Sequence, residues 1–297
     1  VLLPATLESL KATALKNLLP RQQPLPEAFK ALTQVIQAPA RDNIPAPVRE
    51  QALNLFNRLP STSDPGFKPQ LQRALIDSGL MSEAKLLRGL SLSSDLKLQV
   101  TQLMQRIVQL LPENRLLQAN LDPRLLLMQP KAQAGTLPDS GVKLLIGLLK
   151  HLDGAVARIQ TQQLASLPHE DTARQVWQFE LPVRNGDEID LFHIRIGRDD
   201  RGNAGENEEA AWSLTLHMDL ADLGPMRVQL RLQAEQLSTL IWSERSDTNR
   251  LIQNRLHELR NAYEQRGLTV DRLEAHVGMA QRRDEIPLDG SLLHEKA

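Results

Sequence analysis

The apolar residues of this chain recur at two different intervals, and the change from one to the other falls near residue 170. Before it, leucine-rich segments carry apolar residues three or four positions apart, which is the spacing of amphipathic helices. After it, apolar and polar residues alternate, which is typical of strands with one buried face. The sequence therefore predicts an α+β protein, with a mainly helical N-terminal half followed by a C-terminal β-sheet domain.

Proline and small polar residues mark the expected ends of the helices in the first half. Pro26 and Pro47 fall where a first helical turn tolerates proline. Ser82 and Ser94 are expected to cap the helices that follow them, and Gly79 is expected to end the helix before it. The segments 20–25, 39–46 and 60–68 are rich in proline and polar residues and are expected to be loops. The expected helices are 6–19, 26–37, 47–59, 69–78, 82–89, 94–111 and 140–164.

The second half contains five alternating segments, one helix and a final strand. Asn185-Gly186 between the first two segments is a strong hairpin signal. The helix near 247–266 is expected to be capped by Ser246 or Asp247 and ended by Gly267. The final strand changes phase near Asp271, which predicts a β-bulge, and it is expected to run parallel to the strand before the helix. The order β-β-β-β-β-α-β then needs its one helix packed on the sheet, because neither can bury its apolar side alone.

Three regions are expected along the 297 residues. Residues 1–170 form a helical, leucine-rich region with proline-rich linkers, 171–278 form the α+β domain, and 279–297 form a polar, flexible tail. The net charge of −1 gives no general attraction to nucleic acid, and no apolar run is long enough for direct membrane insertion. With no cysteine, the chain has no disulfide, thiolate metal site or cysteine nucleophile.

A turn and an alternating strand at 223–232 predict a sheet surface in a fixed register. The turn Leu223-Gly224-Pro225 comes first, and Gly224 is expected to take a positive φ there. Met226, Val228, Leu230 and Leu232 then fall on one side of the strand. The residues between them, on the side expected to be exposed, are Arg227, Gln229 and Arg231.

The polar residues of the chain form no recognisable catalytic, metal or cofactor motif. The seven histidines include no HExxH motif, and His193 and His217, on neighbouring strands, fit a solvated face better than a metal site. Asp219 and Asp222 flank a turn, where turn and capping roles are more usual than acid–base catalysis. The loop 201–210 lacks the pattern of a phosphate-binding loop, and the charge run 281–285 fits a solvated tail. The expected packing residues of the sheet include Trp177, Trp212 and Trp242.

The stretch from Trp212 to Gly278 contains, in order, an alternating strand, the turn Leu223-Gly224, two further strands, a helix with Leu259-Arg260 and a closing strand after a Gly-Leu turn. In this order and spacing it resembles the C-terminal domain of the bacterial flagellar hook-length control proteins. The resemblance covers roughly residues 174–278 and departs at the turn, where Leu220 stands in place of a proline that the family often has and Pro225 follows the glycine. The first 170 residues also differ, because they look helical where the family often has long low-complexity measuring segments. The residues that carry it are Leu214, Leu216, Leu223, Gly224, Val228, Leu230, Leu232, Leu240, Trp242, Leu251, Leu256, Leu259, Arg260, Gly267, Leu268 and Val270.

This resemblance implies a cytoplasmic, non-enzymatic protein that is itself exported by the flagellar type III apparatus. Its C-terminal domain would bind the cytosolic domain of the export-gate membrane protein and switch export from hook to filament subunits. Hook or hook-cap proteins are further candidate partners, and Arg227, Gln229 and Arg231 become the candidate partner-binding residues. Two alternatives remain open: an adaptor or regulator that uses the same domain outside flagella, and, less well supported, a hydrolase or nucleotide-binding enzyme on an unfamiliar fold.

Overall fold

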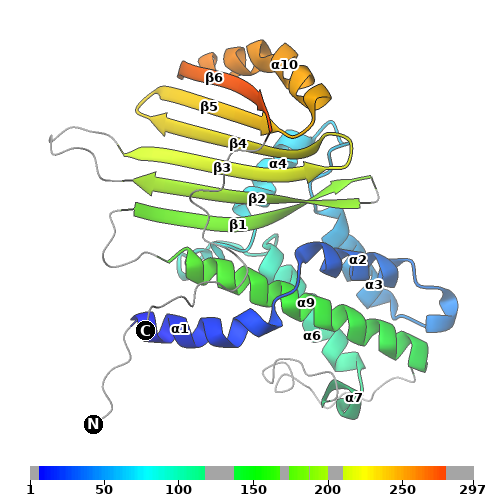
Figure 1. Ribbon diagram of the computed structural model, residues 1–297. Coiled ribbons are helices and arrows are strands. Elements are labelled where there is room, and N and C mark those ends of the chain that lie inside the picture. The colour runs from blue at the N-terminus through cyan, green and yellow to red at the C-terminus, as the bar shows by residue number, and fades with distance from the viewer. Residues whose placement is uncertain (1–6, 118–136, 168–173, 187, 200–209, 279–297) are drawn as a thin grey trace, which may run out of the picture. The chain divides into compact units, whose positions relative to one another are not determined.

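The computed structural model describes residues 7–117, 137–167, 174–186, 188–199 and 210–278. Helices precede a six-stranded sheet in the order β1-β2-β3-β4-β5-β6, with one helix between the last two strands (Figure 1). This confirms the predicted α+β class. The expected tail 279–297, the loop 201–210 except its last residue, and the histidines at 169 and 294 lie outside the described residues.

The chain divides into two compact units, which are described separately. One contains Val1–Ala165 together with Phe179–Leu191, and the other contains Ser166–Gln178 together with Phe192–Ala297. The first hairpin of the sheet therefore contributes residues to both units. The expected domain boundary at residue 170 stays a prediction.

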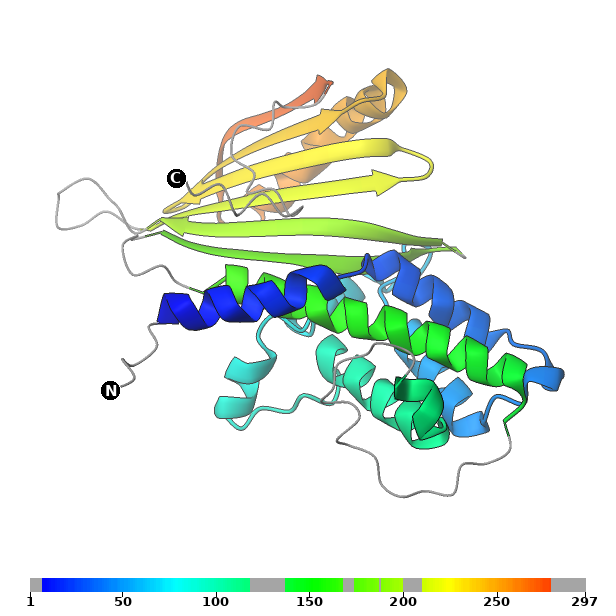
Figure 2. The ribbon, with the colours of Figure 1, turned by 60° about the horizontal axis from the view of Figure 1, so that its bottom comes forward.

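The helices of the first unit pack around one apolar core (Figure 2). Helices α2, α3, α6 and α9 contact one another, and Leu145 and Leu149 of α9 are fully buried among them. All seven helices predicted in the first half are present, with ends shifted by a few residues. The elements are α1 (Leu7–Leu18), η1 (Leu19–Arg21), α2 (Leu25–Ile36), η2 (Ala40–Asp42), α3 (Ala46–Asn57), α4 (Phe67–Ile76), α5 (Ser82–Leu87), α6 (Leu96–Leu110), α7 (Glu113–Leu117) and α9 (Asp139–Ala165).

Two of the predicted helix caps in this unit are wrong, and one buried carboxylate explains both. Asp95, not Ser94, is the N-cap of α6, and its side chain accepts from the Leu98 N–H at 3.3 Å. Ser82 is the first residue of α5 rather than its cap, because its hydroxyl donates to Asp95 Oδ1 at 2.8 Å. The carboxylate thus joins the starts of two helices, which the local sequence around each start does not reveal. Gly79 does lie just beyond α4 with φ +92°.

Phe179–Leu191 of the first hairpin belong to the helical unit. Strand β1 (Arg174–Asn185) buries Phe179, Leu181 and Val183 there, and Ile189 of β2 (Glu188–Asp199) packs on the helical core. Glu180, which alternation places on a wet face, is only 2% exposed. The Arg158 guanidinium of α9 donates to both its oxygens, with Nε–Oε2 at 2.5 Å, and this hydrogen bond raises the pKa of Arg158. Local alternation does not reveal this burial, because the partner of Glu180 lies on a distant helix.

The second unit has the predicted order and register. Strands β3 (Ala211–Leu220), β4 (Gly224–Gln233) and β5 (Gln236–Ser243) are antiparallel, and β6 (Thr269–Val277) pairs parallel to β5. The register shifts between Leu237 and Ser238 on β5 and skips Asp271 on β6, which confirms the predicted bulge. β2 pairs with β3 from His193 opposite His217 to Asp199 opposite Ala211.

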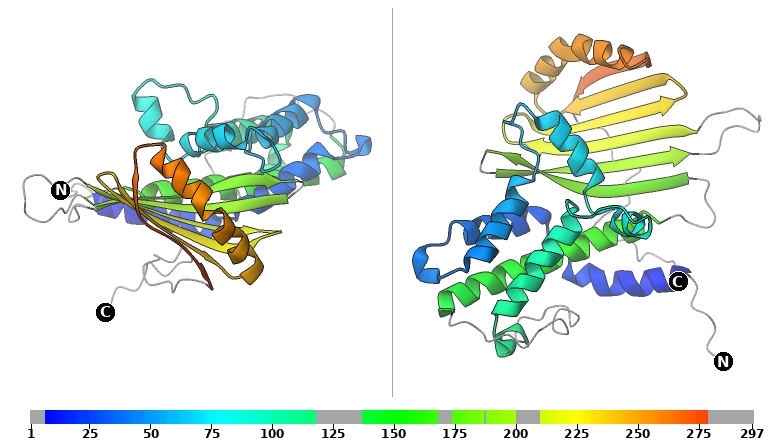
Figure 3. Two further views of the ribbon diagram at one scale, coloured as in Figure 1. Left: turned by 90° about the horizontal axis from the view of Figure 1, so that it is seen from above. Right: turned by 180° about the vertical axis from the view of Figure 1, so that it is seen from behind.

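Helix α10 (Ser246–Glu264) connects β5 to β6 and covers only part of the sheet. It contacts β6 and, less extensively, β5 (Figure 3). Its N-cap is Arg245 without a side-chain hydrogen bond, so the predicted cap by Ser246 or Asp247 is wrong. At its other end, Gly267 has φ +78° and donates to the Glu264 carbonyl at 2.9 Å, while Leu268 donates to Tyr263. This is a Schellman ending and confirms the predicted role of Gly267.

Candidate functional site

The polar face of the sheet is built from rows of residues that lie opposite one another on neighbouring strands. One row crosses five strands and contains His193, His217, Arg227, Trp242 and His276 in direct register. The rings of Trp242 and His276 lie 6.0 Å apart at a tilt of 32°. Since cross-strand neighbours on one face are close enough to interact, this row forms one continuous band of histidine, arginine and tryptophan side chains.

The β6 end of this face carries a small exposed charge network. Arg272 donates to both oxygens of Glu274, at 2.8 and 2.7 Å, and His276 Nε2 lies 3.0 Å from the same carboxylate. The hydrogen bond from Arg272 is the main cause that lowers the pKa of Glu274, with a smaller contribution from His276. Exposed pairs of this kind add little stability, so their effect here is to fix the orientation of the side chains.

The three candidate partner-binding residues on β4 differ in their accessibility. Arg231 is exposed and Gln229 is half-buried, but Arg227 is only 5% exposed. With the Gln229 amide oriented to accept, its oxygen lies 3.3 Å from Arg227 Nε and 2.7 Å from Nη2. The expectation that all three line one exposed strip is therefore wrong for Arg227, and the accessible part consists of Arg231 and Gln229. The partner-binding role itself stays a prediction.

The turn Leu223-Gly224-Pro225 is hydrogen-bonded to residues at the start of α10. Gly224 has φ +73°, as predicted, and a Cβ on it would lie 2.8 Å from Cδ of Arg245. The Leu223 carbonyl accepts from Thr248 Oγ1 at 2.7 Å, and the Pro225 carbonyl accepts from the Glu244 N–H at 3.2 Å. The turn therefore fixes the register of β3 and β4 and also positions the helix.

Arg245 and Asp247 add further hydrogen bonds between this turn and the start of α10. Arg245 donates to the carbonyl of Asp222 at 3.1 Å and to the Asp247 carboxylate at 2.7 Å. The Arg245 hydrogen bond, followed by that from the Thr248 N–H, lowers the pKa of Asp247 to about 2. Asp222 thus serves the turn through its backbone, and Asp219, exposed on β3 opposite Pro225, lies on the other side of it.

The opposite face of the sheet carries an aromatic stack that alternation alone does not predict. Trp177 and Trp212 lie parallel with ring centroids 6.0 Å apart, and the Arg198 guanidinium lies 5.7 Å from the Trp212 ring. Trp212 therefore packs against the sheet's other tryptophan, as expected, although it remains 39% exposed. Helix α10 is centred on β6 and β5, which leaves the β3 end of this face with less cover.

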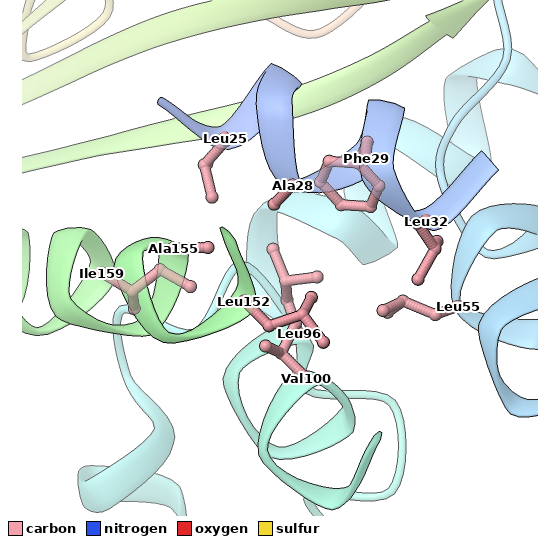
Figure 4. A pocket seen from close by; sticks show the side chains of 10 residues that line it. All are labelled: Leu25, Ala28, Phe29, Leu32, Leu55, Leu96, Val100, Leu152, Ala155 and Ile159. Carbon is pink, nitrogen blue, oxygen red and sulfur yellow. The ribbon is translucent and has the colours of Figure 1, made fainter. Parts of the chain in front are cut away.

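The described residues contain no group of three histidine or acidic side chains placed to hold a metal ion. His193 and His217 do lie opposite each other, as the sequence suggested. The pocket in Figure 4 lies inside the helical core, has a volume of about 10 Å³, and could hold at most a water molecule. Its lining is entirely apolar: Leu25, Ala28, Phe29, Leu32, Leu55, Leu96, Val100, Leu152, Ala155 and Ile159.

The helices in the described ranges are all too short or too polar to cross a bilayer. Residues 201–284 match the sequence model of the family described as flagellar hook-length control protein FliK. The match covers β3, β4, β5, α10 and β6, and it begins after β2. No curated protein and no solved structure matches the chain.

Proposed function

Because residues 201–284 form a domain of the flagellar hook-length control family, we propose that this chain acts in flagellum assembly as an export-specificity switch. The domain binds the cytosolic domain of the export-gate membrane protein and changes export from hook to filament subunits. The family match is the observation that carries this proposal. The fold is consistent with it, since the matched residues form a registered sheet with one helix rather than an extended segment.

The exposed part of the polar face is the surface that we assign to the partner. Arg231 is exposed on β4, and the half-buried Gln229 and Trp242 lie on the same face. Arginine and tryptophan are enriched among the residues that dominate binding energies. An exposed charge such as Arg231 mainly steers association and sets its salt dependence.

Binding rather than chemistry is the role that the site supports. Among the described residues of this unit, the pKa shifts belong to exposed arginine–carboxylate pairs at Arg245–Asp247 and Arg272–Glu274, not to groups gathered in a cleft. A catalytic site is expected to bring perturbed groups together in a concave, water-poor pocket. A chain with no cysteine also has no disulfide to hinder its own export.

The test replaces Arg231 with glutamate and compares it with Arg255→Glu, at an exposed position on α10. Both changes reverse a surface charge and remove little packing, so both variants should keep wild-type circular dichroism and melting temperature. In cells, Arg231→Glu should give overlong hooks with few filaments, and Arg255→Glu should give normal hooks. Normal hooks in both variants would show that the partner binds a different surface of the domain. Normal hook length and filaments in cells that lack the whole gene would contradict the proposed function.

A further inference from the structure

The outer edge of β6 carries backbone groups that no strand of the described chain pairs with. β6 is the last strand of the sheet and pairs with β5 on its inner side. The N–H groups of Thr269 and Gly278 both donate to carbonyls on that inner side. Since successive strand residues direct their backbone groups to alternate sides, Val270 before the bulge, and Leu273 and Ala275 after it, direct theirs outward. Such an edge is a template for another strand.

Two side chains of α10 occupy carbonyls of this outer edge. Gln253 Nε2 donates to the Ala275 carbonyl at 3.3 Å, and Arg260 Nη1 donates to the Val270 carbonyl at 3.4 Å. Both donors project from the same side of the helix, because they are two helical turns apart. Figure 1 shows α10 next to β6 at this end of the sheet. The helix therefore satisfies acceptors that an added strand would otherwise use.

Without these two donors, the edge would be complementary to itself. Arg272 and Glu274 lie on the polar side of β6, with Leu273 between them. If two copies of β6 met in antiparallel order with Leu273 at the two-fold axis, Arg272 of each copy would lie opposite Glu274 of the other. Opposite charges in directly facing positions stabilise a strand pair, and two-fold dimers are the commonest oligomers. A second copy of the chain is therefore a strand whose charges match this edge.

We propose that Gln253 and Arg260 guard the β6 edge and prevent it from pairing with a second copy of the chain. With the carbonyls at 270 and 275 occupied, the part of the edge between them is residues 271–274, which includes the bulge. Strands commonly pair over about five or six residues, and a bulge interrupts the ladder, so this part is too short for a stable pair. The proposal concerns the free chain and does not depend on the proposed function.

The first test measures self-association of the full chain by analytical ultracentrifugation over a range of concentrations. Gln253→Ala with Arg260→Ala removes both donors, and α10 should stay folded because alanine favours a helix. The dissociation constant of the dimer should fall at least about tenfold below that of wild type, since both uncovered carbonyls regain a hydrogen bond on pairing. Asn254→Ala with Arg255→Ala, at exposed positions on the same helix, is the matched control and should associate like wild type.

The second test locates the contact with introduced cysteines, since the chain has none of its own. In the variant that lacks both donors, Leu273→Cys should form a disulfide between two copies on mild oxidation, because Cα atoms at the two-fold axis lie within about 7 Å. Val277→Cys on the same strand is the control, since its two copies would be more than about 20 Å apart. In a chain that keeps Gln253 and Arg260, Leu273→Cys should cross-link more slowly.

Two results would overturn the proposal. One is a double variant that associates no more tightly than the Asn254→Ala, Arg255→Ala control. The other is equal cross-linking at positions 273 and 277. Neither test includes the export gate, so the proposed function is judged separately.

Discussion

The helical core and the central sheet bury their apolar residues to very different degrees. In the helical unit, Leu145 and Leu149 are fully buried and part of one continuous cluster. In the sheet, Leu214 and Leu230, which face each other on β3 and β4, are only half-buried. Burial of apolar side chains should therefore contribute more stability per residue in the helical unit than on these two strands.

The width of a helix explains this difference. A helix with its side chains is about 10 Å wide, and strands are about 4.8 Å apart, so one helix covers about two strands. α10 indeed contacts β5 and β6, and a six-stranded sheet needs more cover than that. The sheet therefore keeps accessible side chains on both faces, with Arg231 on one and Trp212 on the other.

The largest expected loss of stability comes from removing a buried leucine of the helical core. Leu149→Ala should lower the free energy of unfolding by about 4 kcal/mol, because it removes a fully buried side chain and leaves a cavity. Leu230→Ala on β4 should cost only about 1 kcal/mol, since its side chain is already half exposed. Urea unfolding of both variants gives the two values. Similar losses would show that the two regions do not differ in packing.

Loss of the buried ion pair between Glu180 and Arg158 should have the second largest effect on stability. Glu180→Ala leaves Arg158 without its carboxylate in a largely buried place and should cost about 3 kcal/mol. Glu188→Ala, at an exposed position on the same hairpin, is the matched control and should change stability by less than about 0.5 kcal/mol. Thermal and urea unfolding check both. A loss near zero for Glu180→Ala would mean that the pair does not hold the hairpin to the helical unit.

Substitutions of one glycine in each region should change stability in opposite directions, because the two glycines differ in backbone conformation. Gly224→Val should destabilise by about 2 kcal/mol, because a β-branched residue is strained at φ +73° and would also press on Arg245. Gly147→Ala in α9 should instead stabilise by about 0.5 kcal/mol, since a Cβ there has open space and alanine favours a helix. Melting temperatures that shift in opposite directions support the assignment. Wild-type stability of Gly224→Val would show that the turn tolerates other conformations.

The smallest expected effect is the pH dependence of the α10 junction. Because the pKa of Asp247 is lowered to about 2 from 3.8, its ionised form stabilises the fold above about pH 4. That contribution is lost as the pH falls through about 2. Asp247→Asn should therefore melt slightly below wild type at about pH 5, and the difference should shrink toward about pH 2. A difference that grows on acidification would contradict the role of the Arg245 hydrogen bond.

Local sequence patterns predicted the elements of both regions well. The change of apolar interval placed the helices and strands, Gly224 and Gly267 have the positive φ that their turn and helix end require, and the bulge lies at Asp271. These features depend on residues that are close in the chain. The same patterns could not show what covers each face of the sheet, because that depends on distant residues.

Arg227, Glu180 and Trp212 show this limit. Alternation assigned each to a face, but Glu180 is buried by its ion pair with α9, and Arg227 is buried on the face expected to be wet. Trp212 is exposed on the expected apolar face. The sequence pointed to incomplete cover of this face only through its element count, because one helix is much narrower than a six-stranded sheet.

We propose that the sheet binds the cytosolic domain of the export gate. The most direct test titrates the full chain with the purified cytosolic export-gate domain by calorimetry, at two salt concentrations. We expect saturable binding that weakens with salt, and a lower affinity for Arg231→Glu than for Arg255→Glu. Absence of binding by the folded wild-type chain, or equal affinity of both variants, would contradict it.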